Sequence, residues 1–337
     1  MNRPEVFGYS GSGSLGIKVY EAPAGSRIKV QVDIDAIGVS GEIETDVQLV
    51  GGKPKLIVPR LNWDQGRLIA IREPIPTEVV FRVYLDGALT REDRQTIRVR
   101  AINDSPRQSC PEPNDCDDYS LIYAAFVNED NPLIDRVLRD ALDIPAMPVK
   151  TWTGTQGDEA SVVNQVWAIW YLLQRKKFTY SDIPTVADAR PEIFSQTVRP
   201  FSQAWVTAQA NCVDGTAFFA SILRKIGIEP LIVLTPNHAF LGFYTDAQLR
   251  KPVFLETTML NLESNPFNRR EPTKFGMTLS RLSAFDLHVA QSQRSFNDAL
   301  AESQRKYAEV APNMGKGSYR IISIKKAREA GILPLPL

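Results

Sequence analysis

The sequence predicts two domains of different fold class, an all-β sandwich over residues 1–104 and an α+β domain over residues 105–337. Three observations support this division. The chain has 337 residues, which is more than one compact core usually needs. Up to about Ile102 apolar residues recur at the period of strands, and further on they recur at the period of helices. Between the two patterns lies the Pro-, Asp- and Asn-rich stretch 103–118, which predicts the boundary.

The first region contains short alternating segments that Gly-, Pro- and Asp-rich breaks such as "VGGKP" and "LDGALTRED" separate. No helical segment is expected among them. Half-buried strands at this spacing are typical of a small immunoglobulin-like β-sandwich. The expected strands are "RIKVQVDID" (27–35), "ETDVQLV" (44–50), "KLIVPRL" (55–61), "EVVFRVYLDG" (78–87) and "TIRVRAI" (96–102).

The second region begins with amphipathic helices, and each needs a partner to cover its apolar face. The helix pattern over 212–227 is the most apolar of them and ends at Gly227, which favours a left-handed C-cap. Two strand-like runs follow it and form a predicted hairpin. The expected elements are helices over 131–145, 158–177 and 212–227, strands over 237–244 and 252–260, a long polar helix over 285–310, a strand over 319–324 and a short helix over 325–331.

Composition excludes several classes of function. The chain has 39 basic and 39 acidic residues, so no overall field attracts nucleic acid or an anionic membrane. No apolar run approaches the roughly 18 residues of a membrane span, and the first residues resemble no signal peptide. We therefore expect neither a nucleic-acid partner nor an integral membrane segment. The compartment stays open, because the missing leader favours the cytoplasm whereas a cysteine pair favours an oxidising location.

Two motifs have ordinary explanations. The glycines Gly11, Gly13 and Gly16 in "GSGSLG" match a dinucleotide fingerprint, but a strand-like run follows them where that motif requires a helix. We expect a flexible segment there. Cys110 and Cys116 lie close together in a loop-like stretch, where a disulfide or two free thiols are favoured over a metal site with Asp117 or Asp118.

Cys212, His238 and Glu256 form the candidate catalytic constellation. A buried helix that begins with a small apolar thiol is ordinary core material, but the first turn of a helix also stabilises a thiolate and can bind an oxyanion. Asn211 is the expected N-cap. His238 begins a strand and could act as the proton carrier, and in a hairpin that turns at Ala247 it faces Glu256.

Alternatives to this reading remain open. A slip of two residues in the hairpin register would place Thr258 opposite the histidine instead of Glu256. Asp246, in the connecting turn, is a weaker acid candidate and more in keeping with turn chemistry. His288 lies in a helical pattern and is read as structural.

The segment "NCVDGTAFFASILRKIGIEPLIVL", followed by "HAFLGFY" and "FLETTML", resembles the core of the transglutaminase-like superfamily of papain-type cysteine enzymes. The resemblance covers roughly residues 160–260. It implies a papain-like fold and a catalytic triad of Cys212, His238 and Glu256. Asp214 and Gly227 also match family positions, and an upstream side chain, Gln209, Trp205 or Gln203, would complete the oxyanion hole beside Asn211.

The chain departs from that family at three positions. Glu256 stands where the family usually has Asp, and Asn211 and Val213 stand where Gly and an aromatic residue are common. The missing aromatic residue favours hydrolysis over protein crosslinking. The sequence thus predicts a peptidase or amidase, or a transglutaminase, that acts on a protein or peptide through a thiolate and an imidazole and needs no metal or organic cofactor.

Two functions of another class remain as alternatives. One is a non-catalytic interaction protein that keeps the fold. The other is a carbohydrate-binding protein in which Trp63 and Tyr84 are exposed on one sheet face of the first domain.

Overall fold

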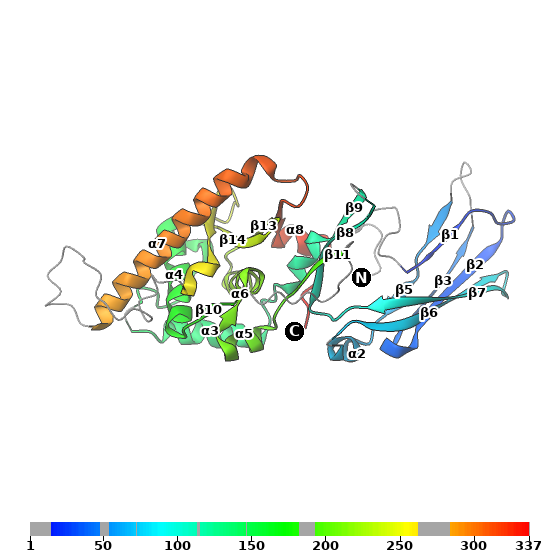
Figure 1. Ribbon diagram of the computed structural model, residues 1–337, viewed down its shortest axis with the longest axis horizontal. Coiled ribbons are helices and arrows are strands. Elements are labelled where there is room, and N and C mark those ends of the chain that lie inside the picture. Colours follow the sequence, from blue (N-terminus) through cyan, green and yellow to red (C-terminus); the bar gives the residue numbers. More distant parts are fainter. Residues whose placement is uncertain are drawn as a thin grey trace. The chain divides into compact units, whose positions relative to one another are not determined.

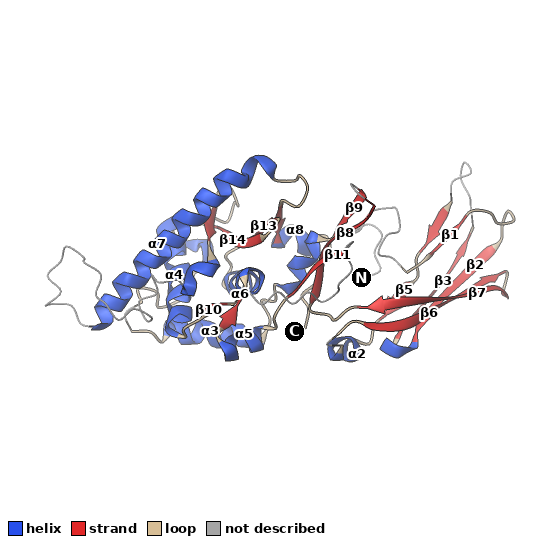
Figure 2. Ribbon diagram, in the orientation of Figure 1, coloured by secondary structure: helices blue, strands red, loops and turns tan. Residues whose placement is uncertain are grey.

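The computed structural model describes residues 15–47, 54–71, 73–112, 115–145, 147–181, 193–261 and 284–336. The fold is mixed, with several β-sheets and several helices (Figures 1 and 2). The chain divides into two compact units. The first holds the chain to Tyr119 and a later segment that ends at Gln196, and the second holds the remainder. This division lies beyond residue 104, where the sequence placed the boundary.

Two antiparallel sheets of the first unit share one hydrophobic core. The larger has the strand order β5-β3-β2-β6-β7, and the smaller pairs β1 with β4. Alternate residues of β2 are buried, and the same core includes Val19 from β1 and Ile57 from β4. The strands are β1 (Ile17–Val19), β2 (Arg27–Ile34), β3 (Val39–Asp46), β4 (Lys55–Ile57), β5 (Arg60–Asn62), β6 (Ile75–Leu85) and β7 (Ala88–Val99).

The first unit differs from the prediction in two places. It contains a short helix, α2 (Gln65–Ala70), where no helix was expected; Asp64 caps it by accepting a hydrogen bond from the backbone N–H of Arg67 at 3.0 Å. The predicted break "LDGALTRED" is reduced to the tight turn at Asp86 and Gly87, and the remaining residues extend β7. Both residues have positive φ, which suits a two-residue hairpin turn.

The predicted loop 103–118 forms strands instead. β8 (Asp104–Glu112) and β9 (Asp115–Asp118) belong to a three-stranded sheet with β11 (Ile193–Thr197). A disulfide joins Cys110 to Cys116, with an S–S distance of 2.13 Å, and Cys212 is free. Among the described residues, no group of three or more His, Cys, Asp or Glu side chains is placed to hold a metal ion.

The second unit is built around the helix α6 and a four-stranded antiparallel sheet of order β15-β14-β13-β16. α6 packs on β13 and β14, while α7, the orange helix of Figure 1, packs on β15 and α4. The strands are β10 (Thr179–Tyr180), β12 (Gln209–Ala210), β13 (Pro230–Thr235), β14 (His238–Tyr244), β15 (Pro252–Leu255) and β16 (Arg320–Ser323). The helices are α3 (Pro132–Leu142), α4 (Glu159–Arg175), α5 (Phe201–Thr207), α6 (Cys212–Lys225), α7 (Ala284–Val310) and α8 (Ile324–Glu329).

Aromatic side chains hold the helices of this unit together. Trp170 of α4 contacts Phe219 of α6 and Phe296 of α7, with ring centroids 6.4 and 5.8 Å apart. Phe254 of β15 stacks on Tyr307 of α7 at 3.9 Å. These contacts join α4, α6, α7 and β15 in one packed core.

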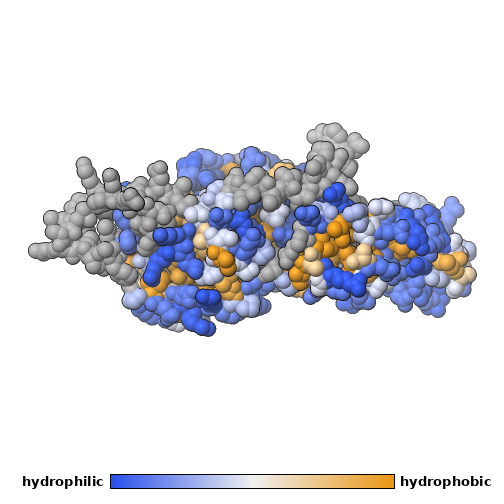
Figure 3. Space-filling view, turned by 60° about the horizontal axis from the view of Figure 1, so that its bottom comes forward, coloured by the Kyte–Doolittle hydropathy of each residue, from blue (hydrophilic) through white to orange (hydrophobic). Residues whose placement is uncertain are grey.

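The surface in the view of Figure 3 is mainly hydrophilic, and its hydrophobic residues lie in separate groups. Within the described residues, no helix combines the length and apolar character needed to cross a membrane. Gly11 and Gly13 of the glycine-rich motif lie outside the described residues. The chain after Gly16 is the strand β1, so the helix that a dinucleotide fingerprint needs does not follow it.

Candidate active site

Cys212 is the first residue of α6, and a reciprocal pair of hydrogen bonds fixes this helix start. The Asn211 side chain accepts a hydrogen bond from the Asp214 N–H at 2.8 Å, and the Asp214 side chain accepts one from the Asn211 N–H at 3.1 Å. Such a capping box satisfies two N–H groups that have no partner within the helix. The Cys212 side chain therefore starts from a rigid, largely buried backbone.

Asp214 also links the start of α6 to Arg199, which precedes α5. Its Oδ1 accepts a hydrogen bond from the backbone N–H of Arg199 at 2.7 Å, and the Arg199 guanidinium lies 3.7 Å from Oδ2. Burial raises the pKa of Asp214, although the hydrogen bonds from Arg199 and Asn211 oppose that shift. The acidic residue two positions after the cysteine thus holds the segment before α5 against the start of α6.

His238 is the first residue of β14, directly after the two-residue turn that joins it to β13. Its backbone pairs with Thr235, and its side chain is about one quarter exposed, at 24%. The ring Nε2 lies 2.7 Å from Glu256 Oε2, and the ring also forms a hydrogen bond with the Cys212 side chain. Since Nε2 faces the carboxylate, Nδ1 is the nitrogen left for Cys212.

The electrostatics of His238 favour the imidazolium form. Burial alone would lower the pKa of His238, but the hydrogen bonds and charges of Cys212 and Glu256 outweigh it and raise the pKa to about 9. A histidine in this state can stabilise a thiolate and supply a proton to a leaving group.

The hairpin that brings Glu256 to His238 has a different register from the predicted one. Leu241 pairs with Leu255 and Phe243 with Val253, which is two residues away from the register that places His238 opposite Glu256. β15 ends at Leu255, however, and the chain turns into the short 3-10 helix η4 (Thr257–Asn261). Glu256 occupies this turn, and its side chain reaches the histidine from there.

Thr258, the residue that the shifted register would place opposite His238, contacts the carboxylate instead. Its N–H and its hydroxyl donate to Glu256 Oε1 at 3.2 and 2.7 Å. The other oxygen, Oε2, meets both His238 Nε2 and Lys306 Nζ at 2.7 Å. Both oxygens of the buried carboxylate are therefore satisfied.

These contacts determine the charge of Glu256. The side chain is only 1% exposed, and burial alone would raise its pKa. The hydrogen bond and charge of His238, with the hydrogen bonds from Lys306 and Thr258, outweigh burial and lower the pKa to about 2. Glu256 is thus an anion over the whole physiological range of pH.

Gly215 allows η4 to lie close to α6. A Cβ atom at Gly215 would lie 3.1 Å from Thr257 Oγ1, so only glycine leaves this approach free of crowding. The turn that carries Glu256 and the helix that begins with Cys212 are held together here. Close packing between α6 and η4 thus explains why position 215 is a glycine.

The other residues that the sequence proposed for the site have different surroundings. Asn211 is the helix cap, and Asp246 accepts hydrogen bonds within its own turn, as turn chemistry requires. Trp205 packs on Phe178 and Phe218 and lies under Lys176 Nζ, the contacts of a core side chain. Gln203 is exposed in α5, Gln209 is half-buried in β12, and His288 lies half-buried in α7.

Lys306 is the residue of this site that sequence reasoning missed. It lies in α7, far along the chain from Cys212, and its Nζ contacts the same carboxylate oxygen as His238. One feature of the sequence could have indicated that Lys306 faces the interior. Lys306 lies on the helix face that continues from Phe296, Ala299 and Ser303, all of which are buried.

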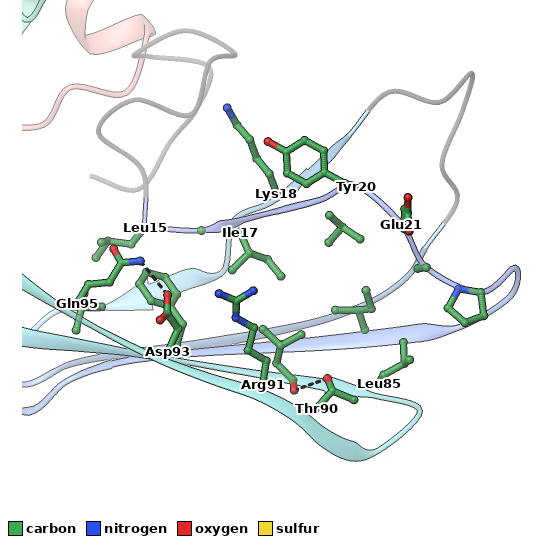
Figure 4. Close-up of a pocket in the computed structure, with 18 of the residues that line it drawn as sticks. Leu15, Ile17, Lys18, Tyr20, Glu21, Leu85, Thr90, Arg91, Asp93 and Gln95 are labelled. Atoms are coloured by element: carbon green, nitrogen blue, oxygen red, sulfur yellow. Dashed lines mark hydrogen bonds between the residues drawn. The ribbon is translucent and has the colours of Figure 1, made fainter. Parts of the chain in front are cut away.

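The first unit contains a cavity of about 580 Å³ between β1 and the face of the larger sheet (Figure 4). Its floor is apolar, with Ile28, Val79 and Phe81. Arg91, Asp93 and Gln95 rise into the cavity from β7, whereas Tyr20 points away from it. All the residues that line it belong to the first unit.

The aromatic residues considered for carbohydrate binding do not form a common platform. Trp63 follows β5 and is 38% exposed, while Tyr84 lies in β6, with β3 and β2 between these strands. The Tyr84 hydroxyl donates to Gln31 at 3.0 Å, and Lys29 Nζ lies 5.8 Å from its ring. The Tyr84 side chain thus interacts with residues of its own sheet.

Comparison with protein-family models, with curated proteins and with solved structures gives no match to this chain.

Proposed function

We propose that this protein is a cysteine-dependent enzyme that transfers acyl groups from amide bonds, with a papain-like catalytic unit. One observation carries the proposal: the imidazole that is hydrogen-bonded to the Cys212 side chain also lies, through Nε2, 2.7 Å from the buried carboxylate of Glu256. A scaffold has no need to bring a free thiol, an imidazole and a buried carboxylate together. This arrangement is that of an activated nucleophile, its base and the group that orients the base.

The reaction follows from these positions. The Cys212 thiolate attacks the carbonyl carbon of an amide, forming a C–S bond, while N–H groups of the first turn of α6 stabilise the negative oxygen. The C–N bond then breaks, and the leaving amine takes the proton of the His238 imidazolium. Water or a second amine next attacks the thioester, gives its proton to His238, and releases the product with the thiolate restored. Glu256 keeps the ring oriented in both halves.

The experiment uses a defined library of peptides that contain every residue type, with dansylcadaverine present as an amine acceptor. We expect mass spectrometry to detect cleaved or deamidated peptides, or dansylated glutamine side chains, with the wild-type protein. Cys212→Ala should produce none of them. The proposal fails if wild type and Cys212→Ala give the same products, or if neither produces any while His238 and Cys212 show no mutual influence on their reactivity.

A second candidate function is the binding of a small apolar anion in the first unit. The cavity between β1 and the sheet favours it, because an apolar floor is combined there with the cationic side chain of Arg91. We expect anilinonaphthalene sulfonate, an apolar anion, to bind saturably, with several-fold weaker binding to Arg91→Gln. Arg94→Gln is the matched control, since Arg94 lies on the same strand but pairs with Glu78 and Glu92. Equal binding to both variants would remove this candidate.

A further inference from the structure

We infer that Lys306 is a positioning residue of the Cys212 site, acting through Glu256, and that it keeps the buried carboxylate paired when His238 is neutral. This inference rests on the proposed function. No described contact joins Lys306 to Cys212. Lys306 holds the carboxylate of Glu256, which in turn orients the ring of His238.

The geometry separates Lys306 from an ordinary surface lysine. Its Nζ lies 2.7 Å from Glu256 Oε2, whereas its distance to Glu302, the acid one turn earlier on α7, is 3.9 Å. Glu302 itself is bound by Arg305 at 2.7 Å. Only 31% of the Lys306 side chain is exposed, and its closest partner is the buried carboxylate.

Helix α7 is fixed against the strand end that carries Glu256. The Glu256 N–H donates to the carbonyl of Ala299 at 3.3 Å, and Tyr307 stacks on Phe254 at 3.9 Å. Ser303, one turn before Lys306, is completely buried. The position of the ammonium group is therefore determined by backbone and ring contacts on both sides of it.

The charges of the catalytic cycle explain why a fourth residue is needed. While the thiolate and imidazolium coexist, Glu256 is paired with His238. Once the imidazolium has given its proton to the leaving amine, the ring is neutral, and a carboxylate that is 1% exposed would be left without a cation. An unpaired buried charge is strongly unfavourable, and a carboxyl in that state takes up a proton. Lys306 supplies the cation throughout the cycle.

A second consequence concerns the acidity of His238. Lys306 and His238 bind the same oxygen, so the ammonium group takes part of the negative charge that would otherwise stabilise the imidazolium. Lys306 thus makes His238 a better proton donor. The charged or titratable groups that face this point in the described structure are Cys212 from α6, His238 from β14, Glu256 after β15, and Glu302 and Lys306 from α7.

The test is an NMR titration of the histidine rings, which needs no substrate. The chain has 2 histidines, so His288→Gln assigns both signals. We expect Lys306→Met to raise the titration midpoint of His238 by about half a pH unit or more, because a like charge nearby has been removed. Lys306→Arg should restore the wild-type midpoint. Arg305→Met, which removes a neighbouring exposed cation that pairs with Glu302 and Glu309, should leave it unchanged.

The outcomes separate this inference from the proposed function. An unchanged His238 midpoint in folded Lys306→Met overturns the inference, whatever the activity of Cys212. A wild-type midpoint near the ordinary histidine value, with no response to Cys212→Ala, overturns the proposed function instead. If Lys306→Met does not fold, Lys306→Gln keeps a hydrogen-bond donor for Glu256 without the charge, and the same midpoint shift is expected of it.

Discussion

His238→Ala is expected to slow the alkylation of Cys212 by iodoacetamide about 100-fold at pH 6. An ordinary thiol with a pKa of about 8.5 is roughly 0.3% ionised at that pH, and only the thiolate reacts. The pKa of His238 is raised to about 9, so the imidazole is protonated at pH 6. In the proposed mechanism this imidazolium stabilises a thiolate at Cys212. The substitution removes that cation from β14 and leaves the sequence of α6 unchanged.

The measurement is the rate of mass increase on the Cys212 peptide between pH 4 and pH 9. Because Cys110 and Cys116 form a disulfide, the unreduced protein offers Cys212 as its free thiol, and no labelling of the pair competes. His288→Ala is the matched control, since it removes the other histidine of the chain. Equal rates in wild type and His238→Ala at pH 6 would contradict the ion pair and leave Cys212 as a structural residue.

The sequence was sufficient to place Asn211, Cys212 and His238 at the ends of their elements, because short-range rules apply to each of these residues. The N-cap and first-turn positions of Asn211 and Cys212 follow from helix chemistry, and His238 follows a tight turn between two strands. These features depend on a few neighbours in the chain. The structure accordingly has α6 and β14 where the periodicity indicates them.

The register of the β14–β15 hairpin could not be predicted in the same way. Seven residues, "TDAQLRK", five of them polar or charged, connect the two strands, and a loop of this length fixes no unique pairing. The contact between His238 and Glu256 arises because β15 ends at Leu255 and the chain turns into η4. The strand-like pattern of "FLETTML" does not indicate this turn. The predicted neighbour was correct, but the predicted geometry was not.

The domain boundary was misplaced for a related reason. Residues 103–118 are rich in loop formers, yet they form β8 and β9, which a disulfide and the distant strand β11 hold in a sheet. Lys306 is also brought to the site by long-range packing, since α7 lies far from Glu256 in the sequence. Partners supplied by distant segments leave little local signal.

Glu256→Ala is expected to have the largest effect on stability of any substitution in this site. It removes a carboxylate that is 1% exposed and leaves His238 and Lys306 without their common partner. Removing one member of a buried charged network typically costs about 3 to 5 kcal/mol of unfolding free energy. Glu256→Gln keeps one acceptor oxygen for one of the two partners and preserves the side-chain volume. We therefore expect a smaller loss of unfolding free energy, about 1 to 2 kcal/mol. The alkylation of Cys212 at low pH should still be slower than in the wild-type protein.

The pH dependence of that loss identifies the carboxylate as its cause. The pKa of Glu256 is lowered from 4.5 to about 2 in the folded protein, so its contribution to stability is complete above pH 4.5 and disappears as the pH falls towards 2. Urea unfolding should therefore show a large difference between wild type and Glu256→Ala at pH 7 and a much smaller one at pH 3. Glu302→Ala, which removes an acid of α7 that pairs with exposed Arg305, should change stability little at either pH. A Glu256→Ala loss that is equally large at pH 3 would mean that packing, not the paired charge, holds this turn in place.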